Sequence, residues 1–253
     1  MNLVIEQGNT KLKAAVFKNG RIISSVFGNS RNYSIINQII ENKAITKTIV
    51  SSVVDVENDF INDLKSKVSP VIFLNENTPV PITVEYKTPA TLGKDRLAAA
   101  TGANYLKPGK NILVIDAGTA ITYEFIDSEG VFAGGNISPG LTTRFQALNR
   151  FTEKLPLVSE TEYVPFTGYN TETAIIAGVV NGIIFEMDGY IDALKARYKD
   201  FFVFLTGGHA FYFESRLKNH IFADPNLVLT GLNRILDYNA ENKSSRDISP
   251  DGF

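Results

Sequence analysis

The chain has 253 residues, enough for one large domain or two modest ones, and its apolar fraction of 44% and charged fraction of 21% are those of an ordinary globular protein. A formal net charge of −2 gives no general attraction to nucleic acid or to an anionic membrane, so any anion must be bound by local groups. With no cysteine and only two histidines, the sequence excludes disulfides and thiol chemistry and argues against a structural zinc site.

The first part of the chain predicts a three-stranded meander followed by alternating helices and strands. Ile35, Ile36, Ile39 and Ile40 have the spacing of a helix with one buried face. In chain order we expect an opening hairpin through Phe17, a third strand at 21–27, a helix at 30–42, a strand at 47–54, a helix at 56–68 capped by Asp55, and a strand at 71–74. The order of elements is therefore βββαβαβ.

A proline-rich crossing separates this part from the next helix. Residues 75–89 contain three prolines and no helical period, so we expect irregular structure there. Thr91 is expected to cap an alanine-rich helix that runs to about Leu106 and ends at Lys107-Pro108-Gly109. We place a domain boundary here, with an N-terminal domain at 1–108 and a C-terminal domain at 109–239.

The second part begins with the stretch Asn111 to Thr122, in which an apolar run delivers Asp116 into a turn of small residues. We expect a hairpin and third strand, helices at 141–150, 171–198, 210–218 and 231–238, a strand at 201–205, a turn at 206–208, and a polar tail at 240–253. The N-terminus has no signal-peptide pattern, and we expect no stretch able to cross a bilayer. A cytoplasmic protein is the expectation.

The two parts repeat the same pattern. Leu3 to Thr10 matches Leu113 to Ala120 position by position, and Gly20 matches Gly130 at the same offset. We infer two homologous halves, each opening with a hairpin whose turn carries a carboxylate, a glycine and hydroxyl or amide groups. Such turns can hold a phosphate or help to coordinate a cation. Taken alone, Asp116 could equally end a strand at an ordinary hairpin turn.

Four motifs, in this order, resemble those of type III pantothenate kinases, which belong to the actin, Hsp70 and sugar-kinase superfamily. They are Glu6-Gln-Gly-Asn-Thr10, Gly93-Lys-Asp-Arg96, Asp116-Ala-Gly-Thr-Ala-Ile-Thr122 and Thr206-Gly-Gly208. The resemblance implies an α/β fold of two ribonuclease-H-like (actin-like ATPase) domains with mixed five-stranded sheets around a cleft. It also implies pantothenate and ATP as substrates, Mg²⁺, a monovalent cation such as K⁺ or NH₄⁺, and a homodimer whose interface helps to form the pantothenate site.

Asp95 is the expected general base. It lies in the first turns of a predicted helix, where a carboxylate stays ionised, and phosphoryl transfer needs such a group to orient the attacking hydroxyl. Arg96 can pair with a carboxylate in bidentate geometry, and Gly93 leaves room for a substrate. Without the other motifs, Asp95 and Arg96 could be a solvated helical pair.

The resemblance assigns the remaining roles. Tyr86, Gly93, Lys94, Arg96 and Thr171 would line the pantothenate site, although Tyr86 could be a surface aromatic and Thr171 a helix cap. Asp116 would hold the monovalent cation. The ATP-contacting residues would be Glu6, Gln7, Gly8, Asn9, Thr10, Lys11, Leu12, Lys13, Thr119, Gly207 and Gly208, among which Lys13 could instead be a solvated strand residue.

Glu6 departs from the family pattern, which has Asp at this position. The additional methylene moves the carboxylate by about one carbon–carbon bond and can change how it meets Mg²⁺. Two alternatives stay open. One is a small-molecule kinase of the same superfold with another acceptor. The other, which Glu6 suggests, is a nucleotide-binding regulatory protein that has lost catalysis.

Overall fold

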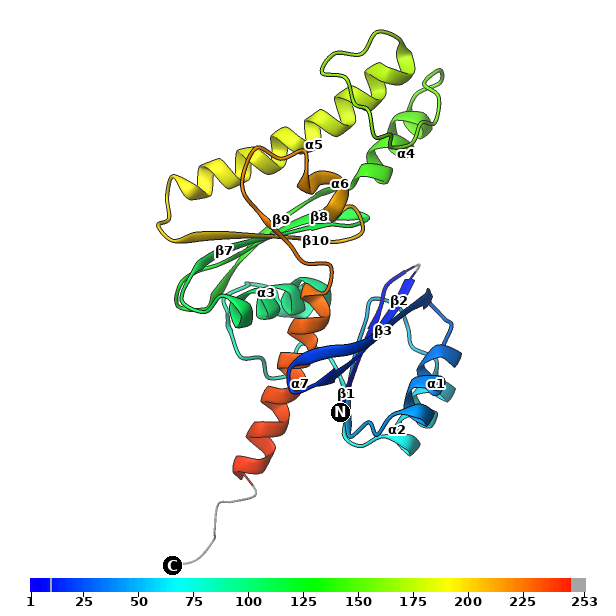
Figure 1. Ribbon diagram of the computed structural model, residues 1–253, viewed down its shortest axis with the longest axis vertical. Coiled ribbons are helices and arrows are strands. Elements are labelled where there is room, and N and C mark those ends of the chain that lie inside the picture. Colours follow the sequence, from blue (N-terminus) through cyan, green and yellow to red (C-terminus); the bar gives the residue numbers. More distant parts are fainter. Residues whose placement is uncertain (10, 247–253) are drawn as a thin grey trace, which may run out of the picture. The chain divides into compact units, whose positions relative to one another are not determined.

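The structure is a computed structural model that describes residues 1–9 and 11–246 (Figure 1). The strands are β1 (Asn2–Gln7), β2 (Lys11–Lys18), β3 (Arg21–Asn29), β4 (Lys47–Ser52), β5 (Val71–Phe73), β6 (Thr83–Val84), β7 (Asn111–Ala117), β8 (Ala120–Ile126), β9 (Val131–Pro139), β10 (Phe201–Thr206) and β11 (Phe222–Ala223). The helices are α1 (Ser34–Asn42), α2 (Asn58–Lys67), the 3₁₀ turn η1 (Pro89–Thr91), α3 (Lys94–Leu106), α4 (Leu141–Phe151), α5 (Thr171–Lys195), α6 (Ala210–Glu214) and α7 (Leu227–Arg246). They form two compact units, the first made of Met1–Leu106 and the chain from Asn226 onward, the second of Lys107–Pro225.

The first unit is built on a five-stranded sheet in the order β3-β2-β1-β4-β5. The hairpin pairs β1 and β2 antiparallel, while β4 joins β1 in parallel through the crossover that contains α1. Leu3 and Ile5 belong to one buried cluster with residues of α1 and α2. Because side chains alternate along a strand, Val4 points to the opposite face, and α7 contacts the sheet as well. Burial on both faces explains why β1 reads as an unbroken apolar run.

Helices α3 and α7 pack closely together through two glycines. A Cβ atom on Gly102 would lie 2.4 Å from the carbonyl oxygen of Leu227, and one on Gly231 would lie 1.8 Å from that of Ala98. Only hydrogen fits at either position, so the helix that carries Asp95 in its first turn is fixed against α7 by backbone contact.

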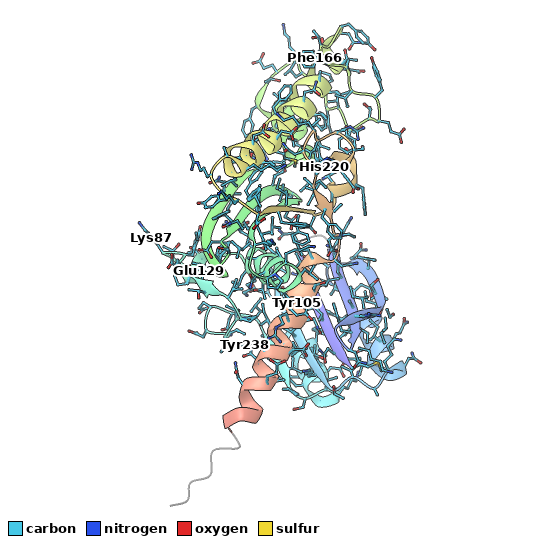
Figure 2. All side chains as sticks on the ribbon, turned by 60° about the vertical axis from the view of Figure 1, so that its left-hand side comes forward. Lys87, Tyr105, Glu129, Phe166, His220 and Tyr238 are labelled. Atoms are coloured by element: carbon cyan, nitrogen blue, oxygen red, sulfur yellow. The ribbon has the colours of Figure 1, made fainter. Side chains whose placement is uncertain are left out.

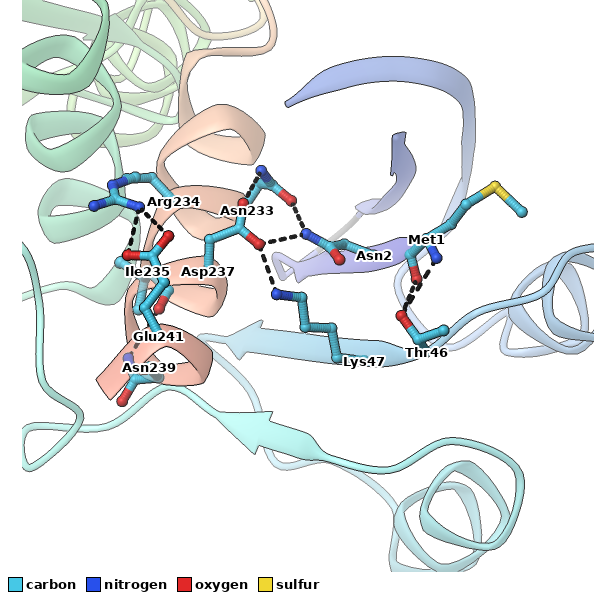
Figure 3. A network of polar contacts seen from close by, with 10 residues as sticks. All are labelled: Met1, Asn2, Thr46, Lys47, Asn233, Arg234, Ile235, Asp237, Asn239 and Glu241. Atoms are coloured by element: carbon cyan, nitrogen blue, oxygen red, sulfur yellow. Dashed lines mark hydrogen bonds and ion pairs between the residues drawn. The ribbon is translucent and has the colours of Figure 1, made fainter. Parts of the chain in front are cut away.

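A polar network fastens α7 to the strands of the first unit (Figure 3). The amide of Asn2 donates to Asn233 at 2.7 Å and to Asp237 at 2.9 Å, and Lys47 forms an ion pair with Asp237 at 2.8 Å. Asn233 is 5% exposed and is satisfied within this network. Side chains from β1, β4 and α7 therefore fix the register of α7 on the sheet.

Among the described residues the second sheet has six strands, where five were expected, and its strands β9-β8-β7-β10-β11 repeat the strand order of the first sheet. β7 pairs antiparallel with β8 and parallel with β10, as β1 does with β2 and β4. The duplicated sequence pattern therefore corresponds to a duplicated topology, and the α/β fold with two mixed sheets is confirmed.

Helix α5 supplies much of the second core. Ile176, Val180, Ile183 and Met187 pack with β7 residues in one buried cluster. Among the described helices, α5 alone has the length and apolar composition to cross a bilayer, which the sequence analysis did not expect. Half of its apolar window is buried inside the unit, as in the core helix of a globular protein.

Several predicted helix ends are wrong because capping was misplaced. Thr91 ends η1, where its hydroxyl donates to the carbonyl oxygen of Thr88 at 2.9 Å, and α3 begins at Lys94. The N-cap residue of α2 is Glu57 instead of Asp55. The predicted start of α5 at Thr171 is confirmed, with Asn170 as its N-cap, since the side chains of Asn170 and Thr173 form a reciprocal capping box; the helix ends at Lys195 instead of Tyr198.

The C-terminal elements also differ from the expectation. α6 ends at Glu214, the short strands β6 and β11 were not predicted, and Val228 and Leu229 lie within α7. This helix runs to Arg246 and belongs to the first compact unit, so residues 240–246 of the predicted polar tail are helical. Residues 247–253 of that tail lie outside the described residues.

The close approach of α3 and α7 leads to a stability prediction. Gly231→Ala forces a methyl group against the backbone of Ala98 and is expected to lower the free energy of unfolding by about 2–3 kcal/mol. Gly189→Ala in α5 is the matched control, because a Cβ there meets open space and alanine favours a helix by ~0.5–1 kcal/mol. Urea unfolding of both variants measures the difference, and equal stabilities would contradict the packing account.

Candidate active site

Glu6 and Lys13 face each other across the first hairpin. The β1–β2 register pairs the two residues directly, and the Lys13 Nζ lies 3.6 Å from the Glu6 Oε2. This oxygen is buried and has no hydrogen-bond partner among the described residues. Burial raises the pKa of Glu6, the nearby Asp95 carboxylate raises it further, and Lys13 opposes the shift. The arrangement leaves one carboxylate oxygen that a cation can bind.

The turn after Glu6 is exposed and partly closed by backbone bonds. The Gly8 amide donates to the Lys11 carbonyl at 2.8 Å, and the side chains of Asn9 and Lys11 are exposed. Leu12 is fully buried in the core, so its side chain packs with the interior and only its backbone can face a ligand. Thr10 lies outside the described residues.

The side chain of Gln7 is hydrogen-bonded to other segments of the first unit. Its amide donates to the Ser30 carbonyl and to the Tyr33 hydroxyl, both at 2.8 Å, and accepts from the Ser52 hydroxyl at 3.2 Å. The side chain is 2% exposed. Gln7 therefore positions the end of β1, and its side chain has no spare donor directed at solvent.

Asp95 is held at the start of α3. The structure confirms that it lies in the first helical turn, where the helix dipole favours a carboxylate. Its Oδ1 accepts the Arg96 amide at 2.8 Å, and a Cβ on Gly93 would lie 2.6 Å from the same oxygen. Glycine is therefore required at position 93 for Asp95 to keep this orientation. Asp95 also acts on the charge of Glu6, so the unit brings these two carboxylates together.

A pocket of about 570 Å³ lies in the first unit, and Gly93 and Lys94, the two residues before Asp95, are part of its lining. Its lining comes from Arg31, residues 52–55 and residues 92–94. Lys94 reaches into the same region, with its Nζ 3.3 Å from the Ser52 carbonyl oxygen. Arg31 and residues 52–55 were missed by the sequence analysis, since they lie at or just after the ends of β3 and β4 and belong to no recognised motif. We call this the first-unit pocket.

Arg96 lies mainly inside the protein. It is 6% exposed, and its guanidinium carbon is 5.6 Å from the ring centroid of Tyr86, a cation–π distance. Tyr86 is half-buried and thus part of this packing. The two predicted acceptor-binding residues lie together.

In the second unit, Asp116 is the penultimate residue of β7 and lies close to two glycines. Gly207, with a φ of +94°, approaches so closely that a Cβ there would be 2.4 Å from the Asp116 Oδ1. A Cβ on Gly118 would lie 3.3 Å from the same oxygen. The His209 amide donates to the Ala117 carbonyl at 3.0 Å and ties the turn after β10 to this one. The turn after β7, near Asp116, and the turn after β10, with Gly207 and Gly208, therefore lie against each other.

Thr119 is presented by the same turn from the other side. Its carbonyl oxygen accepts the Gly140 amide at 3.0 Å and the Thr143 hydroxyl at 2.8 Å, while its side chain is exposed. The hydroxyl is thus accessible on a fixed backbone. His209, by contrast, is half-buried, and its Nδ1 has no partner among the described residues.

Thr171 lines a second, largely apolar pocket of about 890 Å³ between α4 and α5. The charged group in its lining is Arg144, which bonds to Glu186 at 2.5 Å and to the Ser138 hydroxyl at 2.8 Å. Tyr123, buried in β8, donates to Glu186 at 2.7 Å. Burial and the neighbouring carboxylate raise the pKa of this tyrosine, so it remains a donor.

Metal binding can be tested against the donor set. No group of three or more His, Cys, Asp or Glu residues that could hold a metal ion occurs within residues 1–9 and 11–246. Glu6 with its unpartnered oxygen and the neighbouring Asp95 nevertheless offer the carboxylate ligands that Mg²⁺ prefers, with substrate phosphates and water completing the shell. The carboxylates of the first unit therefore suit a divalent cation.

Comparisons with known proteins agree with this chemistry. The family model described as type III pantothenate kinase matches residues 2–193. Among similar curated proteins, the type III pantothenate kinase of Phocaeicola vulgatus is 49% identical over 94% of this chain and 99% of its own length. That of Cytophaga hutchinsonii is 44% identical over 94% and 100%.

Solved structures support the fold alone. A putative Baf family transcriptional activator from Campylobacter jejuni superimposes with a TM-score of 0.60 at 21% identity, covering 94% of this chain and 99% of that one. A putative N-acetylmannosamine kinase from Listeria monocytogenes gives 0.57 at 14% identity, with the same coverage of both chains.

The Arg144–Glu186 pair leads to a pH prediction. Burial alone would raise the pKa of Glu186, but bonds from Arg144, Tyr123 and Ser138 outweigh it and lower the pKa below 4.5. A carboxylate whose pKa is lower in the folded protein than in the unfolded chain stabilises the fold at pH values above its unfolded-chain pKa. This stabilisation is lost as the pH falls through the pKa of the folded state. Because Glu186 is partly exposed, Glu186→Gln should cost about 1 kcal/mol at pH 7.

The measurement is urea unfolding of both proteins from pH 7 to pH 3. The stability difference between wild type and Glu186→Gln should shrink below about pH 4.5. A difference that stays constant over this range would show that the carboxylate charge contributes nothing.

Proposed function

This chain belongs to the type III pantothenate kinase family, and on that premise we propose how its residues carry out the ATP-dependent phosphorylation of pantothenate to 4′-phosphopantothenate. The observation that supports the proposal most strongly is the position of Asp95, which lies in the first turn of α3, accepts the Arg96 amide and directly follows Gly93 and Lys94 of the first-unit pocket lining. ATP and a divalent metal follow from the family. This reaction is the first step of coenzyme A biosynthesis, and we propose that role for the chain.

Asp95 orients the acceptor. Its carboxylate accepts the proton of the primary hydroxyl as the hydroxyl oxygen forms a bond to the γ-phosphorus of ATP. The bond between this phosphorus and the β–γ bridging oxygen breaks, and ADP leaves with the electron pair. Glu6 would hold the divalent cation, which would supply positive charge to the phosphoryl oxygens.

The first-unit pocket holds the acceptor in this proposal. Its volume of about 570 Å³ suits a small molecule, and Lys94 adds positive charge for an acceptor that carries a carboxylate. Arg96, whose guanidinium carbon lies 5.6 Å from the Tyr86 ring centroid, provides a planar donor set. Gly93 keeps the entrance open beside Asp95.

A homodimer is the proposed assembly. Large aromatic side chains of the second unit are exposed, among them Phe151 at 81%, Phe166 at 82% and Phe185 at 60% (Phe166 is labelled in Figure 2). Phe166 and Phe185 lie edge to face with centroids 6.4 Å apart. Apolar surface of this kind favours burial against another protein. A second copy of the chain would cover this apolar surface. It would also place its own residues beside Thr171, so that Thr171 and the second copy together contribute to the acceptor site.

The remaining proposals concern cation and location. We propose that Asp116 and the oxygens of its turn hold K⁺ or NH₄⁺, while Thr119 and the turn Gly207-Gly208 contact ATP.

We also propose that the protein works in the cytoplasm without a nucleic-acid or membrane partner. Its net charge of −2 supports this, because it gives no general attraction to these anionic surfaces.

An acceptor panel tests the function. The protein is incubated with ATP, Mg²⁺ and K⁺ and with either pantothenate, a hexose, a sugar acid or no acceptor, and ADP formation is measured. ADP release that depends on pantothenate is the expected result. Release with a sugar instead would assign another acceptor, and tight ATP binding without ADP release under all conditions would indicate a nucleotide-binding protein without catalysis.

Asp95→Asn is expected to lower kcat by ~10²–10⁴-fold while leaving the fold and ATP binding intact, because the amide cannot accept the hydroxyl proton. Steady-state kinetics and an ATP titration on the same preparation check both parts. A loss below about tenfold, or ~1.4 kcal/mol of barrier, would mean that another group orients the hydroxyl.

Asp116→Asn is expected to raise the K⁺ concentration needed for half-maximal activity, since a neutral amide attracts a cation less than a carboxylate does. Activity is measured against K⁺ concentration, and the melting temperature is recorded in parallel. If Asp116 only satisfies its turn, the melting temperature will fall and the K⁺ titration will not change.

A further inference from the structure

Lys13 is placed to compete with a divalent cation. It projects from β2 opposite Glu6, and its ammonium lies 3.6 Å from the Glu6 oxygen that has no hydrogen-bond partner among the described residues. Both side chains are largely shielded, with 28% of Lys13 and 20% of Glu6 exposed. An ion pair in such surroundings interacts much more strongly than one in water.

The local charge explains why a cation is needed there. Glu6 and Asp95 carry two negative charges in close proximity, and burial adds to the cost of keeping Glu6 ionised. Lys13 provides one positive charge at the oxygen where a metal would bind. An ammonium and a divalent cation repel each other and cannot both sit beside one oxygen.

We infer that Lys13 is the built-in counter-ion of Glu6 and prevents a divalent cation from binding at this carboxylate until a nucleotide arrives. The inference rests on the proposed function, in which Glu6 and ATP share the metal. ATP phosphates give Lys13 another anionic partner, so its ammonium leaves Glu6 as the metal comes in. Metal and nucleotide binding are thereby coupled.

Glutamate suits this role better than aspartate would. The cross-strand register fixes the backbones of positions 6 and 13, and the longer side chain brings the carboxylate toward the Lys13 ammonium. An aspartate at position 6 would withdraw the carboxylate by about one carbon–carbon bond. The exchange of Lys13 for a metal therefore gives Glu6 a function that depends on its length.

The test is Mn²⁺ binding in the absence of nucleotide, measured on the full chain by the electron paramagnetic resonance signal of free Mn²⁺. Lys13→Gln removes the charge and keeps a hydrogen-bond donor, and we expect it to bind Mn²⁺ at least about tenfold more tightly than wild type. Lys18→Gln is the matched control, since it makes the same change in net charge at an exposed position of the same strand. Lys18→Gln should bind Mn²⁺ like wild type.

A double variant assigns the effect to Glu6. In Glu6→Gln/Lys13→Gln the gain in Mn²⁺ affinity should be lost, because the carboxylate is absent. Circular dichroism verifies folding, and Lys13→Met replaces Lys13→Gln if the latter does not fold. Equal Mn²⁺ affinity of the folded Lys13 and Lys18 variants would overturn the inference. Since no acceptor is present, a failure of pantothenate phosphorylation would leave this result unaffected, and the two outcomes are distinguishable.

Discussion

The cost of placing a carboxylate at the end of a buried strand governs both units of this protein. Glu6 and Asp116 each follow strand residues that are almost completely buried, so each charge needs compensation at its position. The first unit meets the need with Lys13 across the hairpin. The second surrounds Asp116 with a tight turn that the backbone of Gly207 approaches closely. The two halves share topology but solve the same electrostatic problem differently.

That difference gives the halves separate chemical capacities. The Glu6 carboxylate is paired with a lysine, whereas the Asp116 carboxylate lies in a turn where the close approach of Gly207 leaves no room for another side chain. The first unit also has Asp95, oriented by the absence of a side chain at Gly93, and it is the unit with an acceptor-sized polar pocket. Helix α3, which bears Asp95, packs closely on α7 at Gly231, and α7 in turn contacts the sheet of the first unit.

Periodicity and duplication made most of the fold predictable, because Leu3 and Leu113 begin matching apolar strands that can be buried only in a sheet. The helix ends were harder. Asn170 caps α5 through a reciprocal bond with Thr173, and nothing local distinguishes it from Thr171 beforehand. The site followed from motifs, yet the burial of Gln7 in a network of distant segments depends on tertiary contacts that spacing cannot show.

The position of the transferred phosphate tests the central claim most directly. After incubation of the protein with ATP, Mg²⁺, K⁺ and pantothenate, the product is examined by proton-coupled ³¹P nuclear magnetic resonance. Transfer to the primary hydroxyl predicts a phosphomonoester resonance split into a triplet by the two adjacent methylene protons. A doublet from the secondary hydroxyl, an acyl phosphate resonance, or inorganic phosphate as the sole product besides ADP would contradict the account.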